Sequence, residues 1–203
     1  MNTLAHLYLS GIDPERLLGN FIGDSVRGSE FTNLPPGVQR GVLLHRQIDR
    51  FTDTHPVFRS LYKLLRPYFG RYAAVVGDVF LDHYLARDWT SHHPQELNEY
   101  IEWVHRTISP QIGQCPIRSQ RYFEYLVQTQ TLAAYRNIDG IAQTLGQMAK
   151  RARFASRMET GGAVLAEHYA TIESSFEAFF PELVEFAKSR VADAGGPATP
   201  TPH

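Results

Sequence analysis

The chain has 203 residues, of which 43% are hydrophobic and 20% charged, and this composition fits one globular domain with a sizeable core. A formal net charge of −1 and an isoelectric point near 6.8 argue against a dedicated nucleic-acid-binding protein, which needs an excess of basic residues. The single cysteine, Cys115, excludes an internal disulfide and a site with several thiolate ligands, and it favours a cytoplasmic protein.

Apolar residues recur at helical spacing along most of the chain, and no segment shows the sustained alternation of a β-strand. The sequence therefore predicts an all-α fold, a single compact multi-helix bundle over residues 1–190. Residues 191–203 are small and proline-rich, so we expect a disordered tail. No apolar run approaches the roughly 20 residues needed to span a bilayer, and we expect no membrane association.

Proline, glycine and polar clusters divide the chain into about eight predicted helices. The longest are expected over residues 71–89, 95–108, 117–135 and 162–188. Pro181 lies inside the last of these and predicts a kink or a break.

Three of the predicted helices place charged residues on the side that should be buried. In residues 14–28, Asp24 shares a face with apolar neighbours, at about 100° per residue. In residues 40–52, His45 and Asp49 lie one turn apart among apolar residues, and Asp53 and His55 follow directly. In residues 73–89, Asp78 and Asp82 fall in the middle of the apolar stripe.

Buried charges cost several kcal/mol each unless they are paired, hydrogen-bonded or bound to a cation. One interpretation is an internal network in which arginines such as Arg27 and Arg46, or the histidines, satisfy the acids. The other is a metal site between facing helices, because carboxylates with an imidazole are ligands for Mn²⁺ or Mg²⁺, and with lower preference Fe²⁺. The second interpretation has Asp53 and His55 lining the mouth of that site.

Four segments then resemble the acyl carrier protein phosphodiesterase family: MNTLAHLYLS, LLGNFIGDSVRG, GVLLHRQIDRFTDTHP and GDVFLDHYLARDW. The resemblance covers about the first 90 residues. It implies an all-helical fold distantly related to HD-type phosphohydrolases, and a reaction that removes 4′-phosphopantetheine from a serine of holo acyl carrier protein with Mn²⁺ or Mg²⁺. Residues 82 and 83 read Asp-His, the reverse of the His-Asp order of HD proteins.

On this hypothesis the metal ligands are Asp24, His45, Asp49 and Asp82, with Asp78 either a further ligand or a residue that orients one. The catalytic candidates are His83, His55, Asp53 and Arg46. His83 is the first choice for protonating the serine leaving group, with His55 second, while Arg46 and Arg27 are candidates for binding phosphate oxygens. His6 reads as a hydrogen-bonded core histidine and is a reserve candidate, and His92 and His93 read as a loop.

The resemblance also implies an acidic protein partner, holo acyl carrier protein. The best docking candidate is the basic stretch KRARFASR, with Lys150, Arg151, Arg153 and Arg157 in two helical turns, although a solvated helix face has the same pattern. Two alternative functions stay open: an HD-type nucleotide phosphohydrolase, and a non-catalytic helical binding module whose acids pair with arginines.

Overall fold

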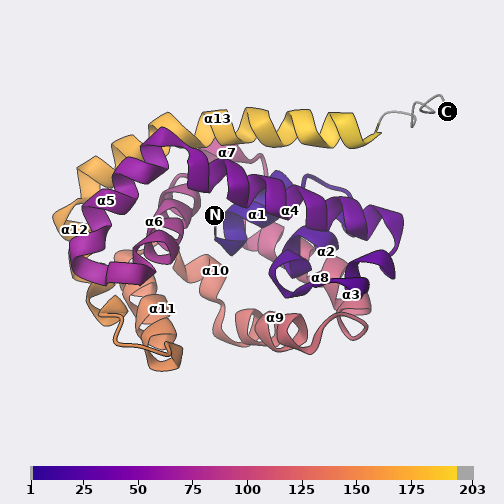
Figure 1. Cartoon of the computed structure of the whole chain (residues 1–203), viewed down its shortest axis with the longest axis horizontal. Coiled ribbons are helices and arrows are strands. Elements are labelled where there is room, and N and C mark those ends of the chain that lie inside the picture. Colours follow the sequence, from indigo (N-terminus) through magenta and orange to yellow (C-terminus); the bar gives the residue numbers. More distant parts are fainter. Residues whose placement is uncertain (1, 196–203) are drawn as a thin grey trace.

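The computed structural model describes residues 2–195 of the chain, and the side chains of residues 2–193. The expected all-α class is confirmed: this range contains helices and 3-10 turns but no β-strand (Figure 1). The α-helices are α1 (Thr3–Leu9), α2 (Pro14–Ile22), α3 (Ser29–Thr32), α4 (Pro36–Thr54), α5 (Pro56–Phe69), α6 (Ala73–Arg87), α7 (Trp89–His92), α8 (Leu97–Ile112), α9 (Ile117–Thr129), α10 (Thr131–Ala134), α11 (Ile138–Arg151), α12 (Gly161–Glu167) and α13 (Tyr169–Gly195). The 3-10 turns are η1 (Gly23–Ser25), η2 (Gly70–Tyr72) and η3 (Met158–Thr160).

Local sequence explains where the site-bearing helices begin and end. The Asp13 carboxylate accepts a hydrogen bond from the backbone N–H of Arg16 and caps α2, which has Pro14 at its first position. Helices α4 and α5 also begin with a proline. Gly70 ends α5 with a positive φ of 55°, a conformation that favours glycine.

The long predicted helices are present, with three differences. The segment predicted as one helix over 117–135 is divided into α9 and α10, because Gln130 adopts a left-handed conformation. The segment over 162–188 is divided at His168, whereas α13 continues through Pro181. Phe179, Phe180 and Leu183 stay buried there, and their packing offsets the backbone donor that proline lacks.

The first residues of the predicted tail are helical. Helix α13 runs to Gly195, so residues 191–195 are helical, and an ion pair between Arg190 and Asp193 stabilises this last part. Residues 196–203 of the predicted tail lie outside the described residues. No helix in the described part of the chain is both long and apolar enough to cross a membrane.

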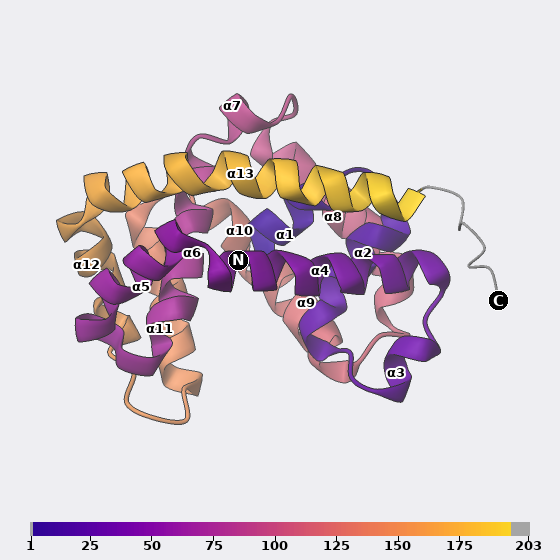
Figure 2. The ribbon, with the colours of Figure 1, turned by 45° about the horizontal axis from the view of Figure 1, so that its top comes forward.

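Helix α13 lies along one side of the molecule and packs on α4, α5 and α6 (Figures 1 and 2). The short helix α1 lies inside, in contact with α2, α6 and α13. Helices α2 and α4 pack closely on each other, and glycines face each other between them: a Cβ atom on Gly41 would lie 2.3 Å from the Arg16 carbonyl oxygen and 2.7 Å from the Cα of Gly19. This close approach brings the polar residues of α2 next to those of α4.

Candidate metal centre and cavity

Two buried histidines and a partly buried aspartate from α1 and α4 converge. Each of His6, His45 and Asp49 offers a ligand atom, and these atoms all lie within 4.8 Å of one another. The two imidazole rings stack with their centroids 4.1 Å apart. One Asp49 oxygen lies 3.1 Å from Nε2 of His6, and the other lies 3.2 Å from Nε2 of His45. Three groups that can bind a cation therefore face one point.

Asn20 of α2 sets the tautomer of both rings. Its side-chain oxygen accepts a hydrogen bond from Nδ1 of His6 at 2.8 Å, and its backbone carbonyl accepts one from Nδ1 of His45 at 2.8 Å. The amide nitrogen of Asn20 donates to the His6 carbonyl and to the Ser10 hydroxyl, which fixes the orientation of the amide. With Nδ1 protonated, the Nε2 atom of each neutral ring carries the lone pair.

The two Nε2 lone pairs face carboxylate oxygens, which is unfavourable unless a proton or a cation lies between them. Burial lowers the pKa of His6 to about 4, although Asp49 opposes the shift. Burial acts in the same direction on His45, but Asp24 and Asp49 outweigh it and raise the pKa of His45 to about 9. Without a bound cation, the His45 ring is therefore protonated near neutral pH, and its positive charge balances the nearby carboxylates.

The donor set fits a divalent cation. Nε2 of His45 is buried and forms no hydrogen bond of good geometry among the described residues, even though carboxylates are close. Both imidazoles already have the tautomer that metal binding needs, and each Nδ1 is held by a carbonyl oxygen, as is common for metal-bound histidines. Imidazoles with carboxylates suit a transition metal such as Mn²⁺ better than Mg²⁺, which prefers oxygen ligands.

Gly23 lets the turn after α2 lie directly against His45. A Cβ atom on Gly23 would come within 2.3 Å of Cγ of His45. Asp24 follows, and its carboxylate lies 3.3 Å from Nε2 of His45 while the side chain stays 76% exposed. The close approach of the His45 ring lowers the pKa of Asp24, so its carboxylate is ionised at the edge of the cluster.

The structure brings Asp24, His45 and Asp49 of the predicted ligands together, but it places Asp82 elsewhere. The Asp82 carboxylate is fully buried and accepts hydrogen bonds from the backbone N–H groups of Leu4, at 2.8 Å, and Ala5, at 3.1 Å. It therefore holds the first turn of α1, the helix that carries His6. Burial raises the pKa of Asp82 to about 7, against the effect of these two hydrogen bonds.

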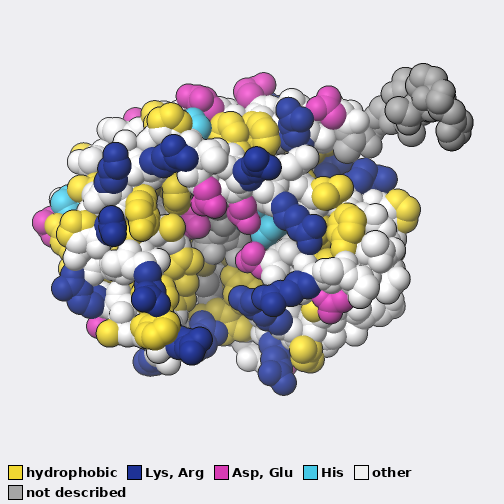
Figure 3. Space-filling model, in the orientation of Figure 1, with side chains coloured by type: hydrophobic (Ala, Val, Ile, Leu, Met, Phe, Trp, Pro, Cys, Tyr) yellow, Lys and Arg dark blue, Asp and Glu magenta, His cyan; other side chains and the backbone are white. Residues whose placement is uncertain are grey.

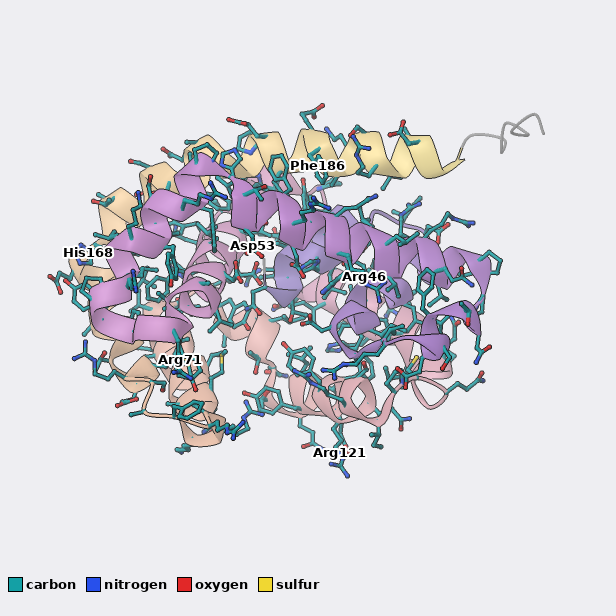
Figure 4. The ribbon with its side chains drawn as sticks, in the orientation of Figure 1. Arg46, Asp53, Arg71, Arg121, His168 and Phe186 are labelled. Carbon is teal, nitrogen blue, oxygen red and sulfur yellow. The ribbon has the colours of Figure 1, made fainter. Side chains whose placement is uncertain are left out.

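Asp78 and Asp53 lie near the cluster without being among its three converging groups. Burial raises the pKa of Asp78 to about 6, and the nearby charges of Asp49 and Asp53 act in the same direction. Asp53 is exposed at the end of α4, on the side of the central hollow (Figure 4).

The predicted proton donors do not line the cavity beside the cluster. His83 is 1% exposed; its Nδ1 donates to the Tyr135 carbonyl, and its Nε2 accepts from the Tyr169 hydroxyl. His55 caps α5, and its Nε2 lies 3.2 Å from a Glu182 oxygen. His83 therefore lies away from the cavity, and His55 does not line the mouth of the site as expected.

Arg46 also has local partners. Its guanidinium donates to the Val26 carbonyl at 3.1 Å and stacks over the Phe31 ring. It lies on the side of α4 that faces the hollow (Figure 4). Arg27 uses its backbone N–H to bind Glu30. Neither arginine is among the residues that line the cavity.

A cavity of about 820 Å³ opens next to the histidines. His6, His45, Asn20 and Asp24 form one end, and aromatic, apolar and basic side chains from η2, α6, α9 and α11 form the other. Figure 3 shows a hollow in the middle of this face, with acidic side chains and a histidine on one edge and basic side chains on the other edges. One edge of the cavity therefore carries negative charge, and the other edges carry positive charge.

The predicted docking stretch 150–157 is not one helical face. Helix α11 ends at Arg151, and residues 152–157 are not helical. Arg157, with φ of 53°, donates to the carbonyls of Pro67 and Tyr68 at the end of α5. Arg153 stacks on Phe154, and of the four basic residues of the stretch it is Arg151 that lines the cavity.

Sequence reasoning left His6 in reserve and did not consider Asn20 as part of the site. His6 sits in a short apolar helix, where a histidine bonded only within the core has the same pattern. The sequence does contain one signal for Asn20, because it lies four residues before the candidate ligand Asp24 and therefore on the same face of the predicted helix 14–28.

A family model described as acyl carrier protein phosphodiesterase matches residues 1–183. The acyl carrier protein phosphodiesterase of Enterobacter sp. (strain 638) is 33% identical over 191 residues, which cover 94% of this chain and 99% of the relative. The protein of the same name from Salmonella agona (strain SL483) is 33% identical over 185 residues, 91% of this chain and 96% of the relative. No solved structure matches the chain, so the expected relation to HD-type proteins stays a prediction. The matched range extends the resemblance far beyond the first 90 residues, and the chain belongs to the acyl carrier protein phosphodiesterase family of enzymes.

Proposed function

We propose that this chain is a metal-dependent phosphodiesterase that removes 4′-phosphopantetheine from holo acyl carrier protein and leaves the apo protein. The names of the relatives support the substrate class. The observation that carries the metal dependence is the convergence of His6, His45 and Asp49, with the buried Nε2 of His45 lacking a well-aligned hydrogen bond among the described residues.

His6, His45 and Asp49 would hold the metal, with Asp24 as a further ligand from the edge of the cluster. Mn²⁺ is the preferred ion, and Mg²⁺ is second. A bound divalent ion supplies positive charge to the phosphoryl oxygens and lowers the pKa of a water molecule, which is what hydrolysis of an anionic diester needs.

The residues of the chain prepare this site in three ways. Asn20 holds both imidazoles with Nε2 free for the metal. Asp82 fixes the N-terminus of α1 and thereby the position of His6. Asp24 stays ionised and exposed at the edge, where it can accept a hydrogen bond from the attacking water.

The cavity suits an elongated arm attached through a phosphodiester. Its polar end contains the cluster, and its walls include the apolar side chains of Ala74, Val75, Met148 and Met158. Burying the aliphatic part of the arm against these side chains is favourable, and it would leave the phosphodiester next to the histidines.

The test is to incubate the purified protein with holo acyl carrier protein and Mn²⁺ and to weigh both products by mass spectrometry. We expect the carrier protein to lose the mass of the arm, and we expect His6→Ala and His45→Ala to abolish this loss because each removes a ligand. The matched control is His93→Gln, at a histidine that stacks on Trp89 and does not line the cavity. An unchanged holo mass with the wild-type enzyme and Mn²⁺ contradicts the proposal, and turnover of free nucleotides instead favours the nucleotide phosphohydrolase.

A further inference from the structure

Four arginines from three separate segments line the end of the cavity away from the histidines. They are Arg71 of η2, Arg118 and Arg121 of α9, and Arg151 of α11, which we call the arginine rim. All four side chains are exposed, and none has a carboxylate within ion-pair distance among residues 2–193. Their positive charge therefore acts on whatever occupies the mouth of the cavity.

Two members of the arginine rim are held by aromatic rings. The guanidinium carbon of Arg71 lies 4.3 Å from the centroid of Phe154, and that of Arg151 lies 4.9 Å from the centroid of Tyr125. Stacking restricts these long side chains before a partner arrives, which reduces the entropy lost on binding. Figure 4 shows Arg71 on one side of the central space and Arg121 across from it, on the outer side of α9.

Large apolar side chains are exposed beside these arginines. Phe154 is 50% exposed in contact with Arg71, and Ile117, directly before Arg118, is 60% exposed. Arginines and aromatic residues are enriched in protein–protein interfaces, where an apolar contact surrounded by charge is common. The surface next to the cavity is thus of the kind that binds another protein.

The number of positive charges in the arginine rim indicates a protein ligand and not a small molecule. A phosphodiester carries one negative charge, and the cluster at the other end of the cavity is the place proposed for it. The four cations of the arginine rim exceed what this one group requires, and they are spread over η2, α9 and α11 at the open side. An acidic surface that surrounds the attachment point of the arm would match them.

Building on the proposed function, we propose that the arginine rim is the docking surface for the acidic carrier protein, with Arg118 and Arg121 of α9 on one wall, Arg71 of η2 on the other, and Arg151 of α11 against Tyr125 of α9. This surface replaces the stretch 150–157, of which Arg151 alone belongs to it. The arginines bind carboxylates of the carrier protein next to the modified serine, and the arm enters the cavity between the two walls.

The test is the affinity for apo acyl carrier protein, which has no arm to remove, so binding is measured apart from hydrolysis. We expect Arg118→Glu/Arg121→Glu to weaken binding at least about tenfold and to flatten the salt dependence between about 50 and about 200 mM NaCl. Arg71→Glu, on the opposite wall, should act in the same direction. The matched control is Arg106→Glu/Arg190→Glu, which changes the net charge equally at exposed arginines outside the cavity and costs two weak surface ion pairs.

The control should bind within about twofold of the wild type, because steering by net charge alone is screened beyond a Debye length. Equal losses in the control and the rim variants, or unchanged binding in the rim variants with native helicity by circular dichroism, would overturn the docking surface. If the protein hydrolyses holo acyl carrier protein but its binding does not depend on the arginine rim, only this inference is disproved. Binding that depends on the rim without hydrolysis would disprove the proposed function alone.

Discussion

Asn20 is the residue on which the chemistry of both histidines depends. It is completely buried, and it binds Nδ1 of one ring through its side chain and Nδ1 of the other through its backbone. A substitution of the side chain therefore affects His6 and leaves the carbonyl contact with His45. Residues that orient metal ligands in this way typically change metal affinity when they are removed.

We predict that Asn20→Ala weakens Mn²⁺ binding by about 10- to 100-fold, because the ring of His6 loses the acceptor that fixes its tautomer. The midpoint of thermal stabilisation in a Mn²⁺ titration measures the effect for each protein against its own metal-free state. Ser10→Ala is the control, since it removes the Asn20–Ser10 hydrogen bond but leaves the bond between Asn20 and His6. Equal Mn²⁺ midpoints in the two variants would contradict the role of Asn20.

His83 gives a prediction about stability and pH. Burial lowers its pKa below the ordinary value of 6.5, so the unfolded chain binds the proton better than the folded one. Its contribution to stability is present above pH 6.5 and is lost as the pH falls below that value. We expect His83→Gln, whose amide can donate to the Tyr135 carbonyl and accept from Tyr169, to lose less free energy of unfolding between pH 6.5 and 5 than the wild type.

Urea unfolding of the metal-free proteins at several pH values measures this slope, and equal slopes would show that His83 does not titrate on unfolding as argued.

The same variant separates a catalytic from a structural role of His83. If His83 protonates the leaving serine, as the sequence alone suggests, His83→Gln also loses activity at every pH; if its role is in packing α6 against α13, activity on holo acyl carrier protein is retained.

At the scale of elements, the crossing of α2 and α4 determines whether the cluster forms. Gly19 and Gly41 bring the two backbones into contact, and the residue after Gly19 is Asn20. Added volume on either side would push α2 away from α4 and move the acceptor atoms away from His45. The glycines therefore act through spacing and not through flexibility.

We predict that Gly41→Ala destabilises the protein by about 1–3 kcal/mol or more, since the new methyl group meets backbone atoms that cannot move independently. Hydrolysis should fall as well, because the displaced helix carries Asn20. Gly146→Ala is the control: it lies inside α11 with open space around it, so it should be neutral or stabilising by up to about 1 kcal/mol. Thermal unfolding and activity of both variants provide the measurements, and a Gly41 variant as stable and active as the control would contradict the argument.

Helix periodicity predicted the buried side of α4 and α6, but it wrongly placed Asp24 inward, whereas that side chain is 76% exposed in the turn after α2. It also does not show what the buried residues contact. It placed Asp82 correctly on the inward face, and Asp82 is indeed fully buried. Its partners are backbone amides 77 and 78 residues away, and nothing in the pattern of residues 73–89 indicates them. The same limit applies to His83: its spacing does not show that the ring is covered by α10 and α13, which come much later in the chain.

For the molecule as a whole, the all-α class and the pair His45 and Asp49 could be predicted because both follow from local spacing. The arginine rim could not, since its members lie on three segments that are brought together by tertiary packing. The nearly neutral net charge gave no indication of it. The compact basic stretch 150–157 was more visible in the sequence, although the fold uses Arg157 to bind α5.

A metal held by α1 and α4, with the turn after α2 beside it, should stabilise the whole fold. We predict that Mn²⁺ at about 100 times its Kd raises the free energy of unfolding by about 2.7 kcal/mol, which corresponds to a rise of about 5–10 °C in Tm. Asp49→Asn is the control, because it weakens a ligand with little change in size. A wild-type Tm that does not respond to Mn²⁺ would favour the non-catalytic binding module.

The order of the groups along the chain has a consequence for altering the enzyme. Every group proposed to touch the metal lies between residues 6 and 49, whereas the arginine rim lies between residues 71 and 151. The proposed metal ligands and the proposed docking surface thus lie in consecutive, non-overlapping stretches of the chain. A chimera can join the first 56 residues of this chain to the remaining residues of a relative. We expect it to keep the metal ligands of this chain and to take its preference among carrier proteins from the relative.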